Sequence, residues 1–329
     1  MKIFKKALYY AVFAAAAYLL LKTTTYGWIF SFKPPAPPQF SVETAQRLKS
    51  HVTRLAVDIG PRDVFGNNRK RLELSKKYLV SELERYGYTP EFQEYPAGGA
   101  KAVNIIASKK GSVTPEEVIV VGAHYDSCDN PGADDNASGT AGVLELARRF
   151  AGLKPARSVR FVLFANEEPP FFAKEGMGSY VYAAEAAKKG ENIKTAVVLE
   201  MIGFYADGKF SQKYPPLVGF FYPNRGNFIA LVSNFASRVP ALEAKKSFKK
   251  ASGLPVEATI LPAKVPGVDF SDHRSFWKFG WPAFMFTDTA FYRNSNYHKP
   301  TDLPETLDYG RMAACVEGIA AAVSDLAGR

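Results

Sequence analysis

Histidine and carboxylate side chains stand at the ends of several apolar segments of this chain. His124 and Asp126 follow one such segment, and Asp134 and Asp135 come a few residues later. Imidazole and carboxylate groups are common zinc ligands, and two-metal sites hold a pair of ions close together. The remaining candidates follow later apolar segments and are Glu167, Glu168, Glu200 and His298. This set predicts a site for two zinc ions, with Asp135 as the ligand that bridges them.

The spacing of His124 and Asp126 predicts a contact between their side chains. In an extended segment, residues two positions apart point to the same side. We therefore expect the Asp126 carboxylate to accept a hydrogen bond from the second ring nitrogen of His124. A carboxylate in this position fixes the orientation of a ligating imidazole.

Two pairs of adjacent carboxylates need compensation. Asp134 and Asp135 repel each other unless a cation or the N-terminus of a helix offsets their charges. The pair Glu167 and Glu168 follows a very apolar run, and neighbouring side chains diverge. We expect one of these glutamates to bind metal while the other acts as the general base toward water, as metal-assisted hydrolysis requires.

The segments that carry these residues alternate between strand-like and helix-like patterns. This alternation favours a three-layer α/β/α sandwich with a mostly parallel, mixed central sheet. In open sheets of this kind, ligands bind beyond the carboxyl ends of the strands, where the candidate residues would converge. The expected strands are 104–107, 118–121, 159–164 and 196–199, with further candidates at 216–221, 257–261 and 281–286. The expected helices lie within 41–56, 69–86, 140–150, 178–188 and 312–326.

The N-terminal segment differs from the remainder of the chain. Residues 1–33 combine early lysines with an apolar run from Ala7 to Leu21, which predicts a membrane anchor or signal segment. No small-residue cleavage motif follows this run, so a retained anchor is favoured. The positive-inside rule then leaves the catalytic domain extracytoplasmic, either periplasmic or extracellular. Residues 34–40 form a proline-rich linker, and residues 41–329 form the predicted catalytic domain.

Composition and cysteine content exclude some classes of protein. The 329 residues carry 42 Lys+Arg against 32 Asp+Glu, but no nucleic-acid-binding motif accompanies the formal charge of +10. Lysines within 245–250 form a basic cluster that could attract anionic lipid or acidic substrates. Only Cys128 and Cys315 are present, which excludes a disulfide framework but not a single bridge. Cys128 lies near the candidate ligands, and we interpret it as a loop residue beside the site.

Four motifs together resemble peptidase family M28, a family of zinc peptidases. The resemblance extends over about residues 41–329 and is strongest in the region between residues 118 and 302. The family contains aminopeptidases, some carboxypeptidases and the related glutaminyl cyclases. The motifs are Gly122–Ser127, Pro131–Gly139, Asn166–Pro170 and Tyr297–Asp302.

The resemblance implies a distribution of ligands over two zinc ions. His124 and Glu200 match the ligands of one ion, and Glu168 and His298 match those of the other. Asp135 matches the bridging ligand. Two Zn²⁺ carry four positive charges and the three carboxylates return three, so a bridging hydroxide nucleophile would balance the centre.

The resemblance also implies catalytic roles. Glu167 matches the general base, and Tyr297 matches a phenol that stabilises the oxyanion in some members. The family keeps a cis peptide bond before the residue that corresponds to Asn136. Glu200 departs from the pattern, because well-known aminopeptidases have aspartate there, and its extra methylene would alter the pocket for a free amino terminus.

Three other polar residues are weaker candidates. Arg293 would contact a substrate carbonyl or carboxylate, or else stabilise its loop. Asp272 and His273 follow Ser271, but adjacent residues cannot form a triad with one another, so we expect structural or supporting roles.

These observations predict a peptidase with two zinc ions that acts on peptide substrates, with an aminopeptidase as the leading interpretation. A second interpretation is another exopeptidase specificity, either carboxypeptidase or dipeptidase. A third is a single-zinc transferase that resembles glutaminyl cyclase. A catalytically silent scaffold is disfavoured because all five ligand positions are filled.

Overall fold

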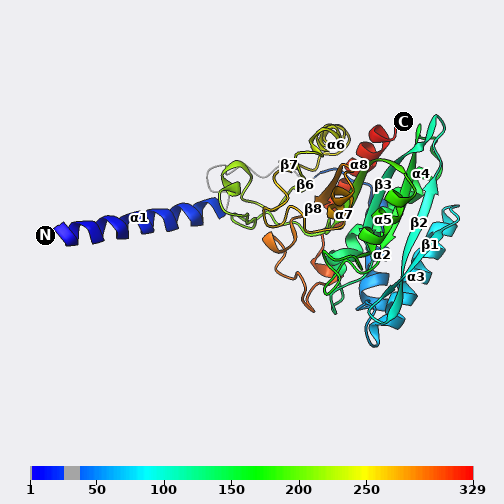
Figure 1. The fold of residues 1–329 in the computed structure, drawn as a ribbon, viewed down its shortest axis with the longest axis horizontal. Helices are drawn as coiled ribbons and strands as arrows, with labels where there is room; N and C mark the ends of the chain where they lie inside the picture. The colour runs from blue at the N-terminus through cyan, green and yellow to red at the C-terminus, as the bar shows by residue number, and fades with distance from the viewer. Residues whose placement is uncertain (1, 26–37, 329) are drawn as a thin grey trace. The chain divides into compact units, whose positions relative to one another are not determined.

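The computed structural model describes residues 2–25 and 38–328 (Figure 1). The chain divides into two compact units. The larger unit comprises residues 37–204 and 228–329, and the smaller one comprises residues 1–36 and 205–227. Every residue predicted for the metal site belongs to the larger unit.

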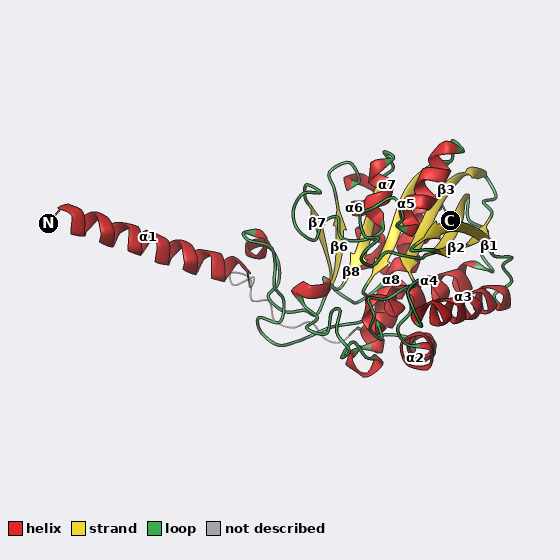
Figure 2. Ribbon diagram, turned by 60° about the horizontal axis from the view of Figure 1, so that its bottom comes forward, coloured by secondary structure: helices red, strands yellow, loops and turns green. Residues whose placement is uncertain are grey.

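The larger unit is built on one mixed sheet of eight strands (Figure 2). Their order across the sheet is β1-β2-β4-β3-β5-β8-β6-β7. The central neighbours β4, β3, β5 and β8 all run parallel, whereas β1, β2 and β6 each form an antiparallel pair. The strands are β1 Glu91–Ala97, β2 Ala100–Lys109, β3 Thr114–His124, β4 Arg157–Phe164, β5 Asn192–Glu200, β6 Ile229–Ser233, β7 Val256–Ile260 and β8 Ala283–Thr287.

Helices cover both faces of this sheet, which confirms the predicted three-layer fold. Helices α4, α6 and α8 pack on one face, with α2 and α3 outside α4 and α8. Helices α5 and α7 pack together on the other face over a core that includes Phe164, Tyr182 and Phe276. The helices of this unit are α2 Val42–Thr53, α3 Asn68–Arg85, α4 Gly139–Phe150, α5 Gly178–Lys188, α6 Arg238–Ala251, α7 His273–Lys278 and α8 Tyr309–Leu326.

The central strands are buried on both faces. In β5 every residue from Thr195 to Glu200 is buried, and all five residues of β8 are buried as well. A continuous apolar run is what a parallel strand needs when helices cover both of its faces. This burial fixes the carboxyl ends of β3, β4 and β5 firmly enough to position functional side chains.

The smaller unit contains helix α1, Lys2–Thr25, and the 3₁₀ helix Val218–Phe221. A backbone bridge joins Ala206 to Gly226 within this unit. In the described residues, no helix combines the length and the apolar character needed to cross a bilayer. The membrane anchor over residues 1–33 therefore stays a prediction, as do the domain boundaries drawn around residues 34–40, most of which lie outside the described residues.

Several sequence predictions of secondary structure need correction. The candidate strand 216–221 is wrong, because Leu217 has a left-handed backbone (φ 71°) and a 3₁₀ helix follows it. Strand β1 was not predicted, since it is a largely exposed edge strand that contains Pro96. The short strand β6 and helices α6 and α7 were also not predicted.

Candidate active site

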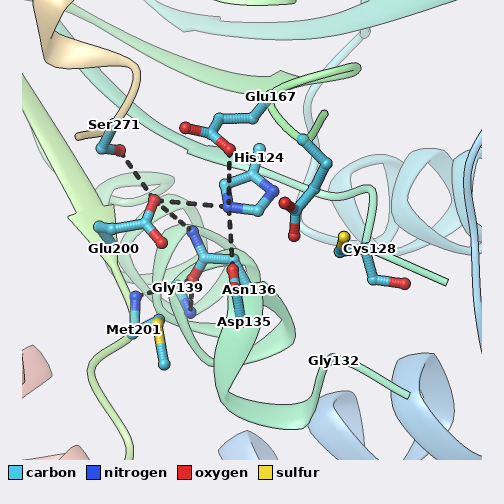
Figure 3. A network of polar contacts seen from close by, with 12 residues as sticks. His124, Cys128, Gly132, Asp135, Asn136, Gly139, Glu167, Glu200, Met201 and Ser271 are labelled. Atoms are coloured by element: carbon cyan, nitrogen blue, oxygen red, sulfur yellow. Dashed lines mark hydrogen bonds and ion pairs between the residues drawn. The ribbon is translucent and has the colours of Figure 1, made fainter. Parts of the chain in front are cut away.

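The predicted metal ligands converge beyond the carboxyl ends of the central strands, and Figure 3 shows three of them, His124, Asp135 and Glu200. His124 is the last residue of β3, and Glu200 is the last residue of β5. Glu167 and Glu168 follow β4, whose last residue pairs with His124 in the sheet register. Parallel pairing thus brings together side chains that are far apart in sequence, at the edge where open sheets bind ligands.

His124, Asp135 and Glu200 form the first group of donors. One ligand atom from each residue lies within 4.8 Å of the other two. The Nε2 atom of His124 is 3.4 Å from Oδ1 of Asp135 and 3.4 Å from Oε2 of Glu200. All three side chains are buried, so this group is shielded from bulk water.

His298, Glu168 and the second oxygen of Asp135 form the second group of donors. The Nε2 atom of His298 is 3.2 Å from Oδ2 of Asp135 and 3.1 Å from Oε2 of Glu168. Asp135 therefore presents one oxygen to His124 and the other to His298. This is the arrangement expected of a carboxylate that bridges two ions.

The donor groups fit metal ions better than they fit hydrogen bonds. The Nε2 atoms of His124 and His298 and Oε1 of Glu168 are buried, and none makes a properly directed hydrogen bond. Buried polar atoms of this kind normally have a partner. In a tetrahedral zinc site with bonds of about 2.0–2.2 Å, neighbouring donor atoms lie about 3.4 Å apart, close to the separations observed here. The two groups are thus suited to hold two zinc ions.

The crowding of buried carboxylates in the site also favours the binding of cations. Burial and the charge of Asp135 raise the pKa of Glu168 to about 8. Burial raises the pKa of Glu167 well above its ordinary value, and the neighbouring charges of Glu200 and Glu168 add to the effect. Burial would also raise the pKa of Asp135, but the imidazoles of His124 and His298 hold it below its ordinary range. Carboxylates crowded in this way remain ionised together only where positive charge is close.

Asp126 links the His124 imidazole to the loop that carries the two glutamates. Its Oδ1 atom lies 3.4 Å from Nδ1 of His124, on the side predicted from the sequence, although this nitrogen does not make the properly directed hydrogen bond that we expected. Its two oxygens also accept hydrogen bonds from the backbone N–H groups of Glu167 and Glu168, both at 3.2 Å. One buried carboxylate thereby orients the histidine and positions the glutamate loop.

Asn136 fastens the Asp135 loop to the end of β5. Its Nδ2 donates to the Leu199 carbonyl at 2.9 Å, and its Oδ1 accepts from the Met201 N–H at 3.1 Å (Figure 3). The peptide bond between Asp135 and Asn136 is cis, as the resemblance implied. Gly139 must lack a side chain, since a Cβ atom there would collide with the Asn136 side chain and the Leu199 carbonyl.

Glu167 lies beside His124 of the first donor group. Its side chain is buried, and its Oε2 atom is 4.0 Å from Nε2 of His124. Glu167 and Glu168 diverge as predicted, because Glu168 turns toward His298 while Glu167 approaches His124. This placement leaves Glu167 available for proton transfer.

The other two predicted contact residues have different surroundings. The Tyr297 ring stacks on the His298 ring with 3.8 Å between their centroids, which places the phenol beside the second donor group. Arg293 is buried, and its guanidinium donates to the backbone carbonyls of Phe228 at 2.8 Å and Phe204 at 3.3 Å. These contacts favour the loop-stabilising interpretation of Arg293 over substrate binding.

Three residues that support the candidate ligands were not predicted from the sequence. Asp302 accepts hydrogen bonds from the backbone N–H groups of Asp134 and Asp135 at 2.9 and 3.1 Å. Ser271 donates to Oε2 of Glu200 at 2.7 Å. Arg62, which is fully buried, binds the carbonyls of the loop before Asp135. Asp302 belongs to a recognised motif, but the sequence around Arg62 gives no signal for its role.

Asp272, His273 and Cys128 also have defined positions. Asp272 and His273 are fully buried, and a ring nitrogen of His273 contacts the Val268 carbonyl at 2.8 Å, in keeping with a structural role. Cys128 is half-buried, and its sulfur lies within 4.8 Å of ligand atoms of Glu168 and His298. It therefore lies closer to the second donor group than its interpretation as a simple loop residue implies.

Comparison with known proteins connects this geometry to a protein family. The model of peptidase family M28 matches residues 104–323, the region that holds every predicted metal ligand. The uncharacterized protein YfbL of Escherichia coli K12 is 38% identical over 295 residues, which are 87% of this chain and 88% of YfbL. Leupeptin-inactivating enzyme 1 of Streptomyces exfoliatus is 28% identical over 225 residues, but the match covers only 50% of that enzyme.

Solved structures share the fold at low sequence identity. The zinc aminopeptidase BSAP of Bacillus subtilis superposes with a TM-score of 0.69 at 16% identity, covering 86% of this chain and 95% of BSAP. A glutaminyl cyclase of Bacteroides thetaiotaomicron superposes with a TM-score of 0.63 at 20% identity, covering 87% of this chain and 98% of the cyclase. At these identities, both comparisons show that the fold is shared.

Proposed function

The chain belongs to peptidase family M28, and from this premise we propose that it is an aminopeptidase with two zinc ions at its centre. As a member of this family it is a zinc-dependent hydrolase of peptides. The number of ions, the roles of individual residues and the preference for a free amino terminus are the parts that we propose.

The shared position of Asp135 carries the proposal of two ions. Its Oδ1 atom lies with His124 and Glu200, and its Oδ2 atom lies with Glu168 and His298. A site for a single ion would need only one group of donors, and it would need no carboxylate shared between two groups. Bound zinc ions supply Lewis acidity, which activates water near neutral pH and polarises the scissile carbonyl.

Glu167 is the proposed general base. Its buried carboxylate lies 4.0 Å from Nε2 of His124, where it would take a proton from water that the ions would bind. A raised pKa suits a group that takes a proton from water and then delivers it to the leaving amine. The phenol of Tyr297 keeps its proton, because burial raises its pKa, and it is thus a donor to the developing oxyanion.

The acidic character of the pocket supports an aminopeptidase over a carboxypeptidase. Glu167 is the buried carboxylate that stays free once Glu168 and Glu200 hold the ions, and the two buried arginines of the described residues, Arg62 and Arg293, both donate to backbone carbonyls. An α-ammonium group is attracted to such a pocket, whereas a C-terminal carboxylate is repelled. Arg293, the candidate for binding a carboxylate, is engaged with backbone carbonyls instead.

A substrate panel tests the proposed function. The full-length protein is assayed with aminoacyl p-nitroanilides, their N-acetylated forms, C-terminally free dipeptides and peptides with N-terminal glutamine. We expect hydrolysis of the free aminoacyl substrates alone, loss of activity with a chelator, and recovery when zinc is added. Activity on acetylated substrates would contradict the aminopeptidase proposal. Cyclisation of the glutamine peptides with one bound zinc would favour the cyclase interpretation.

The location of the enzyme is a separate proposal. The lysines and apolar run of residues 1–33 motivate a tethered enzyme whose catalytic unit lies outside the cytoplasm. Fusion of a reporter that is active only outside the cytoplasm to the C-terminus tests this proposal. An inactive reporter, together with an active cytoplasmic reporter at the same position, would reverse it.

A further inference from the structure

Cys128 lies beside the second donor group. Its Sγ atom, a carboxylate oxygen of Glu168 and a ring nitrogen of His298 all lie within 4.8 Å of one another. In the view of Figure 3, Cys128 and Glu200 lie on opposite sides of His124, and the thiol does not belong to the group formed by His124, Asp135 and Glu200. The larger unit thus offers a sulfur donor at one ion site and none at the other.

A network of hydrogen bonds holds Cys128 in place. The Ser127 hydroxyl donates to the Asn130 carbonyl at 2.9 Å, and the Asn130 side chain donates to the Cys128 carbonyl at 3.0 Å. The Ser127 N–H also donates to the carbonyl of the buried Arg62 at 2.9 Å. This turn therefore fixes the Cys128 backbone near the donor group by contacts with the protein alone.

Two atoms of the second donor group are available to bind a metal ion. Oε1 of Glu168 and Nε2 of His298 are buried without a directed hydrogen bond. Glu168 is only 4% exposed. Buried polar atoms without a hydrogen-bond partner, in residues whose ligand atoms lie within 4.8 Å of a thiol, suit a metal site.

We propose that Cys128 is a protein ligand of the second zinc ion, together with Glu168, His298 and the shared Asp135. This inference rests on the proposed two-ion function. The second ion would then have four protein donors and the first ion three, so the open position for water would lie at the first ion. The sulfur binds as a thiolate, so the protein itself would supply four negative charges to the two ions, one more than the three carboxylates supply.

The proposal predicts different metal preferences at the two sites. Thiolate is a soft ligand that favours zinc, cobalt and cadmium over manganese and magnesium. The first site contains only nitrogen and oxygen donors, which manganese accepts. We therefore expect Mn²⁺ to replace the first ion more readily than the second.

Cobalt spectroscopy tests the sulfur bond directly. Metal is removed from the full-length protein with a chelator, and two equivalents of Co²⁺ are added. We expect a thiolate-to-cobalt charge-transfer band in the near ultraviolet that is present in the wild type and absent in Cys128→Ser. Cys315→Ser is the matched control and retains the band, because Cys315 lies buried in helix α8.

Zinc affinity and thiol protection provide readouts that do not depend on spectroscopy. We expect Cys128→Ser to weaken the second zinc site by at least about 10–100-fold, the range found when outer partners of metal ligands are lost. Bound zinc should protect Cys128 from alkylation by iodoacetamide, as measured by mass spectrometry. Circular dichroism and the unchanged affinity of the first site verify that the variant is folded.

The outcomes separate this inference from the proposed function. Two bound cobalt ions without the charge-transfer band would overturn the role of Cys128 and leave the two-ion enzyme intact. Binding of fewer than two ions by the wild type would overturn both. If Mn²⁺ replaced both ions equally readily, this result would also contradict the assignment of Cys128 as a thiolate ligand of the second ion.

Discussion

The Ser271 hydroxyl donates a 2.7 Å hydrogen bond to Oε2 of Glu200, the same oxygen that lies 3.4 Å from Nε2 of His124. Ser271 comes from the segment before α7, and Glu200 ends β5. The bond fixes one rotamer of a glutamate whose additional methylene would otherwise let its carboxylate move. Ser271 therefore compensates in part for the presence of glutamate where well-known aminopeptidases have aspartate.

Removal of this hydrogen bond should weaken the first metal site. We expect Ser271→Ala to lower its zinc affinity about 10–100-fold, because the Glu200 carboxylate loses the contact that orients it. Competition with a chromophoric chelator measures the affinity. Ser275→Ala is the matched control, since it removes a buried hydroxyl that contacts Ser179 and not the site. Equal affinities for Ser271→Ala and the wild type would show that Glu200 needs no such support.

Exchange of the proposed general base should separate catalysis from metal binding. We expect Glu167→Gln to lower kcat by about 10²–10⁴-fold, since the amide cannot accept the proton of the attacking water. Its metal content should remain that of the wild type, because Glu168 and Glu200 still bind the ions. Glu168→Gln is the contrasting variant and should lose the second ion. Metal analysis together with steady-state kinetics measures both effects. A Glu167→Gln enzyme with normal kcat would exclude the assigned role.

Sequence patterns pointed to several of the candidate ligands because these residues lie at or just after the end of an apolar strand. His124 and Glu200 are the last residues of β3 and β5, where a buried run gives way to polar residues. The parallel arrangement then followed from alternation of strands and helices. The family and the fold class predicted in this way are both confirmed.

The roles of residues that bind backbone groups were not predicted from the sequence. Arg62 binds carbonyls and Asp302 binds amides, and such contacts leave no pattern of residue types at a fixed spacing. Cys128 was interpreted as a loop residue, because only the three-dimensional path of residues 127–130 brings its sulfur toward Glu168. Strand β1 was not predicted for a different reason, since an exposed edge strand lacks a clear apolar pattern.

Replacement of Arg62 should destabilise the larger unit. Its guanidinium is fully buried and donates to the carbonyls of Tyr125 at 2.8 Å, Pro131 at 2.6 Å and Gly132 at 2.9 Å. Burial lowers its pKa to about 10, so it is still charged at neutral pH. We expect Arg62→Met to lower the free energy of unfolding by about 3–5 kcal/mol, because several buried carbonyls lose their donors.

Urea unfolding of the metal-free protein measures this effect without contributions from zinc binding. Arg62→Lys should be intermediate, since an ammonium group cannot reproduce the planar arrangement of guanidinium donors. Arg69→Met is the control for loss of an exposed arginine and should change stability by no more than about 0.5 kcal/mol. If Arg62→Met lost no more unfolding free energy than Arg69→Met, the carbonyls around Arg62 would have found other hydrogen-bond donors.

The buried His51 should make stability depend on pH at a position remote from the proposed metal ligands. Its Nδ1 atom lies 2.6 Å from the Tyr78 hydroxyl, and its side chain is 5% exposed. Burial lowers its pKa from 6.5 to about 4, although the charge of Glu145 opposes this shift. The unfolded chain therefore binds a proton more readily than the folded one. The contribution of His51 to stability is complete above pH 6.5 and is lost as the pH falls toward 4.

Comparison of two pH values isolates this contribution. Between pH 7.5 and 4.5 we expect the wild type to lose roughly 2.5 kcal/mol more unfolding free energy than His51→Asn, which has no imidazole to protonate. Other acid-sensitive groups, including His124 and His298, are present in both proteins and cancel in the difference. Urea unfolding of the metal-free proteins at both pH values measures it. If wild type and variant lose the same free energy, His51 is protonated in the folded protein as readily as in the unfolded chain.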